Sequence, residues 1–202
     1  MISRVFTEEK DIYAFRHGYH GLVGNARTVT NLGSWSSTHV DKLDCVRLSL
    51  PKSNGEEALK DVKDIVKTSS GNKPGVLVYE PLQAKGGMNL APAGFLKGVV
   101  EHFKGLKAVT ICDESNTGLG RIGKESWGFK WQNHVPDIAI IGSSLGNGSA
   151  LSAVVTRKEI ASVIKHAWFN TFAAGHMQTK IGIAVINTIN QEKLNENAEY
   201  LG

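Results

Sequence analysis

Short runs of apolar residues alternate along the chain with longer stretches whose apolar residues recur at helical spacing. The runs Val76-Leu77-Val78-Tyr79 and Ile138-Ala139-Ile140-Ile141 contain no charged residue. A strand that is apolar on both sides has to be buried on both sides, which is typical of parallel sheets covered by helices. The sequence therefore predicts an α/β fold, with a mainly parallel sheet and helices on both faces.

The same reading assigns the individual elements. Strands are expected at 12–15, 45–50, 76–79, 108–112, 138–141 and 153–156. Helices are expected at 55–68, at 95–103, near 158–166 and at 177–191, and a long polar loop is expected at 16–39. Because the chain shows no internal repeat, low-complexity tract or linker, it is interpreted as one domain covering 1–202.

Composition excludes several classes of function. The net charge of +4 comes from 23 basic and 19 acidic residues that are mixed along the chain, which argues against a nucleic-acid-binding face. No apolar run reaches the roughly 18 residues of a membrane-spanning helix. Cys45 and Cys112 cannot build a disulfide scaffold and fit a reducing compartment. Acidic residues in 1–10, without an apolar core, argue against a secretory signal and an ordinary mitochondrial presequence.

Ligands of open parallel sheets bind beyond the carboxyl ends of the strands. That rule directs attention to Tyr19-His20-Gly21, Glu80-Pro81-Leu82-Gln83, Asp113-Glu114 and Gly142-Ser143-Ser144. A carboxylate at Asp113 could hold a cationic ring nitrogen. Taken alone, an aspartate here is also consistent with a helix cap or a turn.

The context of Asp113 is more specific. The segment 111–123 reads ICDESNTGLGRIG and is followed by Trp127-Gly128-Phe129 and Val135-Pro136-Asp137-Ile138. This order resembles the central signature of class III aminotransferases, which are pyridoxal-phosphate enzymes of fold type I. Segments 15–21, 80–83, 145–148 and 169–172 resemble other motifs of that family in the same order. The residues of these motifs are most similar to those of the alanine–glyoxylate aminotransferase 2 group, and the resemblance covers almost the whole chain.

The resemblance implies roles for five residues. Asp113 would keep the pyridine nitrogen of the cofactor protonated, and Tyr19 would stack on its ring. Asn116 lies where the family binds the phenolic oxygen, and Thr171 would contact a phosphate across a dimer interface. His20 belongs to the aromatic-His-Gly loop. On the residues alone, His17 and His20 are interpreted as loop histidines, and Asp113 as a structural carboxylate held by backbone donors or by Arg121.

The chain also departs from the family pattern. Ser143 stands where the family has the lysine that forms a Schiff base, a bond that a hydroxyl cannot form. Ser115 and Asn116 replace a Val-Gln pair, and 173–176 replace Gly-Gly-Asn-Pro. Family chains are about twice as long, so the phosphate-anchoring loop and the carboxy-terminal small domain are expected to be absent.

These departures predict a catalytically inactive aminotransferase-like protein that acts as a structural or accessory subunit. No cofactor is expected, or pyridoxal phosphate if the family function is retained, and no metal. The alternatives are a transaminase of alanine–glyoxylate type and a noncovalent pyridoxal-phosphate binder. Apolar surface left uncovered by a short chain predicts an obligate protein partner, either a homodimer mate or a larger complex. The resemblance favours a mitochondrial location, and otherwise a cytoplasmic one.

Overall fold

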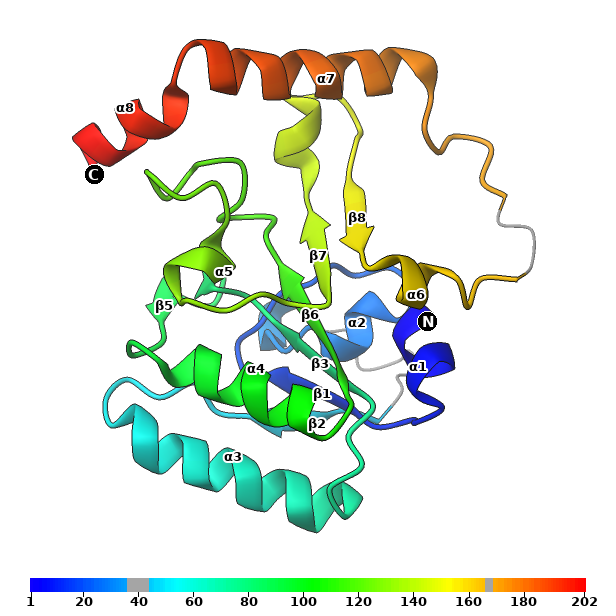
Figure 1. Cartoon of the computed structure of the whole chain (residues 1–202), viewed down its shortest axis with the longest axis vertical. Helices are drawn as coiled ribbons and strands as arrows, with labels where there is room; N and C mark the ends of the chain where they lie inside the picture. The colour runs from blue at the N-terminus through cyan, green and yellow to red at the C-terminus, as the bar shows by residue number, and fades with distance from the viewer. Residues whose placement is uncertain (36–43, 166–168) are drawn as a thin grey trace.

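A six-stranded sheet forms the centre of the computed structural model, which describes residues 1–35, 44–165 and 169–202. The sheet order is β2-β1-β3-β6-β7-β8, and every neighbouring pair is parallel except β7 and β8 (Figure 1). The mainly parallel sheet is thus confirmed. The strands are β1 Ile12–Phe15, β2 Val46–Leu48, β3 Val76–Tyr79, β6 Val109–Asp113, β7 Ile138–Ile141 and β8 Ala153–Thr156.

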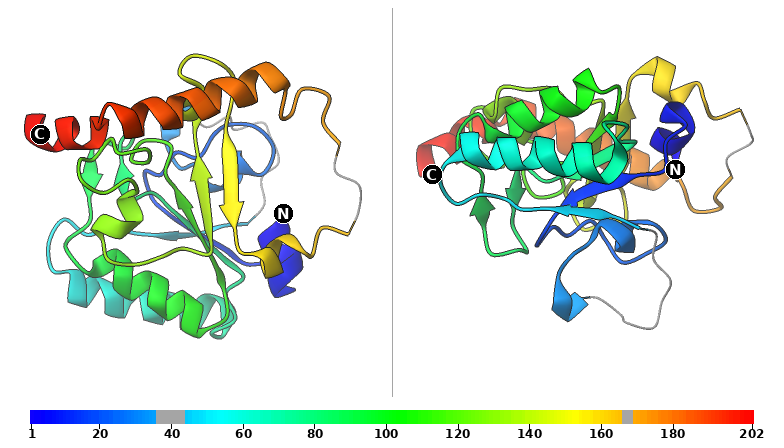
Figure 2. Two further views of the ribbon diagram at one scale, coloured as in Figure 1. Left: turned by 45° about the horizontal axis from the view of Figure 1, so that its top comes forward. Right: turned by 90° about the horizontal axis from the view of Figure 1, so that it is seen from below.

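Two long helices, α3 (Gly55–Ser70) and α4 (Phe95–Gly105), cover one face of the sheet (Figures 1 and 2). Their apolar sides carry Val62 and Phe103, which are almost fully buried with strand residues in the largest core cluster. The Phe103 ring meets the Tyr13 ring edge to face at 5.2 Å. Asn54 caps the start of α3, because its side chain accepts a hydrogen bond from the Glu57 backbone N–H. Asparagine is one of the residues preferred at this position.

The opposite face is covered by three short helices, α1 (Ile2–Thr7), α2 (Ala26–Val29) and α6 (Lys158–Ala161). Val29 packs in a cluster with the strand residues Ile12 and Val76, and Ile160 of α6 packs on Val109 and Ile138. Helices therefore lie on both faces as predicted, but the two layers differ strongly in length.

The remaining elements lie around the carboxyl end of the sheet. Helix α7 (His176–Gln191) crosses above η2 (Ser143–Gly146), and α8 (Leu194–Leu201) continues from it (Figure 2). A small antiparallel pair is formed by β4 (Leu82–Gln83) and β5 (Asn89–Leu90). The other elements are η1 (Gly33–Trp35) and α5 (Gly128–Trp131). None of the helices in the described part of the chain combines the length and the apolar character needed to cross a bilayer.

Several element boundaries differ from the sequence prediction. The helix expected near 158–166 ends at Ala161, and position 166 lies outside the described residues. The loop expected at 16–39 contains α2 and η1, and its last residues are likewise outside the described part. The second strand is only Val46–Leu48, so Cys45 precedes it, whereas Cys112 lies inside β6. Helices α1 and α8 were not predicted, because they are short and lack a long apolar repeat.

Candidate functional site

The four loops that sequence analysis singled out do meet at the carboxyl end of the sheet. Tyr19 of the loop after β1 donates its backbone N–H to Glu80 of the loop after β3, at 2.7 Å. His20 contacts Asp113 at the end of β6. Gly142, after β7, packs so closely on Ser115 that a Cβ there would lie 2.6 Å from the serine hydroxyl. The strand ends to which the sequence directs attention are therefore brought together in one place, which is called the crevice below.

Asp113 and His20 form a nearly buried pair in this crevice. His20 Nδ1 lies 2.8 Å from Asp113 Oδ2, and the two side chains are only 3% and 6% exposed. Ser115 donates both its backbone N–H and its hydroxyl to Asp113 Oδ1, at 3.1 and 2.6 Å. Burial alone would raise the pKa of Asp113, but the bonds from His20 and Ser115 outweigh it and lower that pKa. Asp113 is thus an anion at neutral pH.

Two expectations concern this pair. Arg121 does not hold Asp113, because the loop that carries it turns away toward α8, where Lys124 N–H donates to Glu199 at 2.9 Å. His20 lies in a loop, as expected, and its ring is bonded to Asp113 while its backbone N–H donates to Thr30 at 2.9 Å. The separation of 93 residues between His20 and Asp113 hid this contact from sequence reasoning. The expected backbone donor to Asp113 is present, in Ser115.

Glu80 is the second buried carboxylate of the crevice. Its Oε1 accepts the Tyr19 N–H, whereas its Oε2 is buried without a hydrogen-bond partner in the described part of the chain. Burial is the main reason that the pKa of Glu80 is raised. The Tyr19 ring meets Trp35 at 5.2 Å in an edge-to-face contact, and the Lys85 amine lies over the Tyr19 ring.

Two other buried carboxylates, Glu114 and Asp137, have structural roles. Glu114 is fully buried and accepts the N–H groups of Gly128 and Phe129 at 2.9 Å and the Thr117 hydroxyl at 2.6 Å. It therefore ties the Asp-Glu motif to the Trp-Gly-Phe motif. Asp137 is also structural, because it accepts the backbone N–H of Thr110 and pairs with Arg157, both at 2.9 Å.

Ser143 begins the 3-10 helix η2 and is exposed. Its hydroxyl makes no hydrogen bond within the described residues. Asn116 is half-buried and Thr171 is exposed, and no hydrogen bond joins either side chain to the Asp113–His20 pair in the described structure. The ligand-binding roles of Asp113, Tyr19, His20, Asn116 and Thr171 remain predictions.

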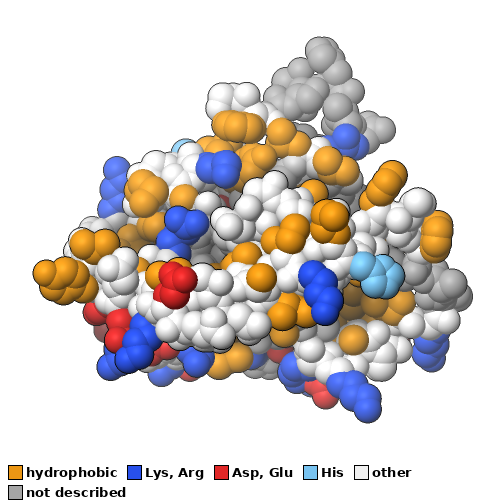
Figure 3. Space-filling view, turned by 90° about the horizontal axis from the view of Figure 1, so that it is seen from above, with side chains coloured by type: hydrophobic (Ala, Val, Ile, Leu, Met, Phe, Trp, Pro, Cys, Tyr) orange, Lys and Arg blue, Asp and Glu red, His pale blue; other side chains and the backbone are white. Residues whose placement is uncertain are grey.

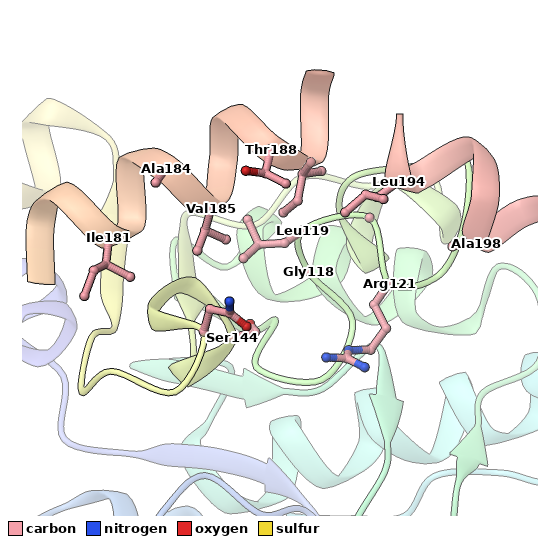
Figure 4. Close-up of a pocket in the computed structure, with 13 residues that line it drawn as sticks. Gly118, Leu119, Arg121, Ser144, Ile181, Ala184, Val185, Thr188, Leu194 and Ala198 are labelled. Carbon is pink, nitrogen blue, oxygen red and sulfur yellow. The ribbon is translucent and has the colours of Figure 1, made fainter. Parts of the chain in front are cut away.

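A separate hollow of about 560 Å³ lies between α7, α8 and the loop Gly118–Arg121 (Figure 4). Its α7 wall is mostly apolar, and Val185 of that wall lies beside Leu119. Ser144 belongs to its lining, so the hollow borders the position next to Ser143. Sequence reasoning did not find it, because its lining comes from four separate segments that carry no common motif. Within the described residues, no group of three or more histidines, cysteines and carboxylates gathers as a metal site would require.

The profile of the family described as Aminotransferase class-III matches residues 1–202. The chain belongs to the class III aminotransferases. It is 36% identical over 211 residues to "Alanine--glyoxylate aminotransferase 2 homolog 2, mitochondrial" of Arabidopsis thaliana, covering 100% of this chain and 44% of that protein. It is 29% identical over 235 residues to "Alanine--glyoxylate aminotransferase 2, mitochondrial" of Homo sapiens, covering 100% and 45%. This class III chain spans about half the length of the curated relatives it matches.

Solved structures place this class III chain in the fold of the large domain of fold type I pyridoxal-phosphate enzymes. A phospholyase from Arthrobacter, solved in complex with phosphoethanolamine, superposes with a TM-score of 0.89 at 27% identity, covering 100% of this chain and 50% of that one. An S-selective transaminase from Arthrobacter sp. superposes with a TM-score of 0.87 at 25% identity, covering 100% and 49%. The predicted fold class and family are confirmed.

Proposed function

We propose that this chain is a catalytically inactive aminotransferase-like protein that serves as a subunit of a larger assembly. The observation that carries the proposal is Ser143, an exposed hydroxyl at the position where the resemblance puts a lysine. A serine cannot form a Schiff base, and its hydroxyl is a poor proton carrier near neutral pH. The chain thus has no group at that position to move a proton during transamination.

A second candidate function is noncovalent binding of pyridoxal phosphate. It is favoured by the residues around Asp113, on the side of the crevice away from Ser143. The ionised Asp113 carboxylate fits a protonated pyridine nitrogen, and His20 and Ser115 hold it in place. Tyr19 offers an aromatic ring beside it. When bound, pyridoxal phosphate supplies an electron sink for a carbanion at the α-carbon of an amino acid. The residues fit the ring of this group but not its usual covalent attachment at 143.

The proposal of a protein partner rests on exposed apolar side chains around α7. Phe169 and Phe172, just before α7, are 86% and 92% exposed, and Met177 at its start is 73% exposed. Figure 3 shows hydrophobic side chains spread over the face that carries α7, with Lys and Arg groups between them. Side chains of this size are rarely left in water together. A homodimer mate or another subunit that covers them is therefore part of the proposal.

Native mass spectrometry of the particle isolated from its own cells tests the partner. Recovery of the chain with a second copy or with other proteins is expected, whereas a monomer of this chain alone would contradict the proposal. The relatives named mitochondrial support a mitochondrial location, which fractionation of the same cells would check.

Turnover decides whether the chain is inactive. The purified chain, supplied with pyridoxal phosphate, L-alanine and glyoxylate, is expected to form no glycine. The matched variants Ser143→Lys and Ser144→Lys place an amine at the family position and beside it. Ser143→Lys is also expected to remain inactive, because Ser115 and Asn116 differ from the family as well. Turnover by the unmodified chain would instead establish a transaminase.

Equilibrium binding decides the second candidate. Pyridoxal phosphate titrated into the chain, followed by quenching of tryptophan fluorescence, is expected to bind the unmodified protein and to bind Asp113→Asn more weakly. The control Asp64→Asn changes a carboxylate on the exposed side of α3. Equal affinity of all three proteins, or no binding, would reject this candidate.

A further inference from the structure

The turn 84–88, between β4 and β5, places an amine beside the Tyr19 ring. Lys85 Nζ lies 4.8 Å from the centroid of the Tyr19 ring. Tyr19 itself is fixed, because its backbone N–H is bonded to Glu80 and its ring rests against Trp35. The Lys85 amine is therefore held beside the aromatic ring that is the candidate surface for a cofactor.

This turn is anchored at its base. Gln83 is 2% exposed and donates its side-chain N–H to the carbonyl of Arg16 at 2.8 Å. Gly86 lies against the loop after β1, where a Cβ would collide with the carbonyl oxygen of His17. Asn89 closes the turn by donating to the carbonyl of Gly86 at 2.8 Å. The backbone that carries Lys85 is thus fixed to the same loop that carries Tyr19.

Lys85 is also free to react. Lys97, Lys104 and Lys193 are each paired with a carboxylate, whereas Lys85 forms no ion pair within the described residues. Its side chain is exposed, and contact of an exposed cation with an aromatic ring is a weak restraint. A four-carbon stem lets the amine move over the ring without moving the backbone.

We propose that Lys85 is the amine through which this crevice captures the aldehyde of pyridoxal phosphate. Lys85 first loses a proton to solvent, and its neutral Nζ attacks the aldehyde carbon. A C–N bond forms, the carbonyl oxygen leaves as water with two hydrogens from the nitrogen, and the product is an imine. No oxidant or reductant is needed. This inference rests on the second candidate function, the pyridoxal-phosphate-binding crevice.

Capture at Lys85 is compatible with an inactive protein. Lys85 reaches the crevice from the β3 side, next to Tyr19, whereas the family position 143 follows β7. Position 143 would still carry a serine hydroxyl. The cofactor would therefore be attached, but the lysine that moves the proton in the family would be absent from that position. The inference therefore adds a covalent binding site and leaves the turnover prediction unchanged.

Borohydride trapping of the full chain tests the inference. The protein is mixed with an equal concentration of pyridoxal phosphate, reduced with sodium borohydride, digested and mapped by mass spectrometry. Reduction converts the imine into a stable secondary amine. The label is expected mainly on Lys85 and is expected to be lost in Lys85→Arg, which keeps the charge but cannot form the adduct. The matched control Lys130→Arg, on α5, is expected to keep it, and Tyr19→Ala is expected to weaken it.

The outcomes separate this inference from the function it rests on. Fluorescence titration that shows Asp113-dependent binding, together with label spread evenly over surface lysines, would overturn capture at Lys85 and leave the noncovalent binder standing. Absence of binding would overturn both. Label that stays unchanged in Lys85→Arg would also overturn the inference, because another amine would then be the site.

Discussion

The two sides of the crevice differ in how their side chains are held. The anionic wall, made of Tyr19, His20, Glu80 and Asp113, is largely buried and joined by hydrogen bonds of 2.7 and 2.8 Å. The serine wall, made of Gly142 and Ser143, ends in an exposed hydroxyl without a partner in the described structure. Buried charges persist in a fold only when they are paired. The anionic wall is therefore built into the fold, whereas Ser143 is free to vary without cost to it.

The largest effect is expected just behind the anionic wall, at Glu114. Glu114→Ala leaves the buried N–H groups of Gly128 and Phe129 without an acceptor, and each such group costs about 1–3 kcal/mol. We expect the free energy of unfolding, measured by urea denaturation, to fall by about 2–6 kcal/mol. The control Glu159→Ala removes an exposed carboxylate paired with Arg157 and is expected to cost less than about 1 kcal/mol. Similar losses for both would show that Glu114 is not a structural link.

The two carboxylates of the anionic wall are expected to depend on pH in opposite directions. The lowered pKa of Asp113 means that its ionised form stabilises the fold above the unfolded pKa of about 3.9, and that this stability is lost as pH falls through the lowered pKa. The raised pKa of Glu80 means that folding favours its protonated form more than the unfolded chain does, so its contribution to stability is present below the unfolded pKa and lost as pH rises through the raised one.

Unfolding measured between pH 3 and pH 8 (roughly the span of these titrations) separates the two. Asp113→Asn is expected to cost about 1.5–3 kcal/mol at neutral pH, the usual worth of a hydrogen bond to a charged group, and less as pH falls. Glu80→Gln keeps an oxygen for the Tyr19 N–H and removes the buried charge, so it is expected to be neutral or stabilising at neutral pH. The same pH dependence in both variants would contradict this account of the anionic wall.

The strands and the covered parallel sheet could be predicted from local sequence, because short runs that are entirely apolar, such as 76–79, are typical of strands buried on both faces. Contacts between distant segments did not follow. His20 and Asp113 are 93 residues apart, so the sequence did not reveal their contact. Of the two kinds of partner expected for Asp113, a backbone donor and Arg121, the structure has the backbone donor, which is Ser115. Glu114 and Asp113 look alike in the sequence, and only the hydrogen bonds from the distant Gly128 and Phe129 show that Glu114 is the structural one. The β4–β5 pair that carries Lys85 has two residues in each strand, too few for a repeat.

Adjacent positions of the serine wall are expected to respond differently. A Cβ at Gly142 would lie 2.6 Å from Ser115 Oγ and 3.0 Å from Ser115 Cα, so a backbone atom would have to move. Gly142→Ala is expected to cost about 1–3 kcal/mol, as overpacking does. Ser143→Ala is expected to stay within about 0.5 kcal/mol, because surface changes away from specific contacts do so. Thermal or urea unfolding of the two variants checks this, and an equal loss would mean that Ser143 is held by the fold.

Ser115, where the two walls join, is expected to show the smallest loss caused by removing a hydrogen bond. Its hydroxyl donates to Asp113 at 2.6 Å, and its side chain is packed on Gly142. Ser115→Ala removes one bond to a carboxylate but keeps the backbone N–H bond and the pair with His20, so we expect a loss of about 1 kcal/mol. The pKa of Asp113, followed by NMR titration of its carboxyl carbon, is expected to rise toward its ordinary value, because one of the bonds that lower it is gone. Ser149→Ala, on the loop after η2, is the matched control and should leave that pKa unchanged. An unchanged pKa in Ser115→Ala would mean that His20 alone keeps Asp113 ionised, and that the anionic wall is independent of the serine wall.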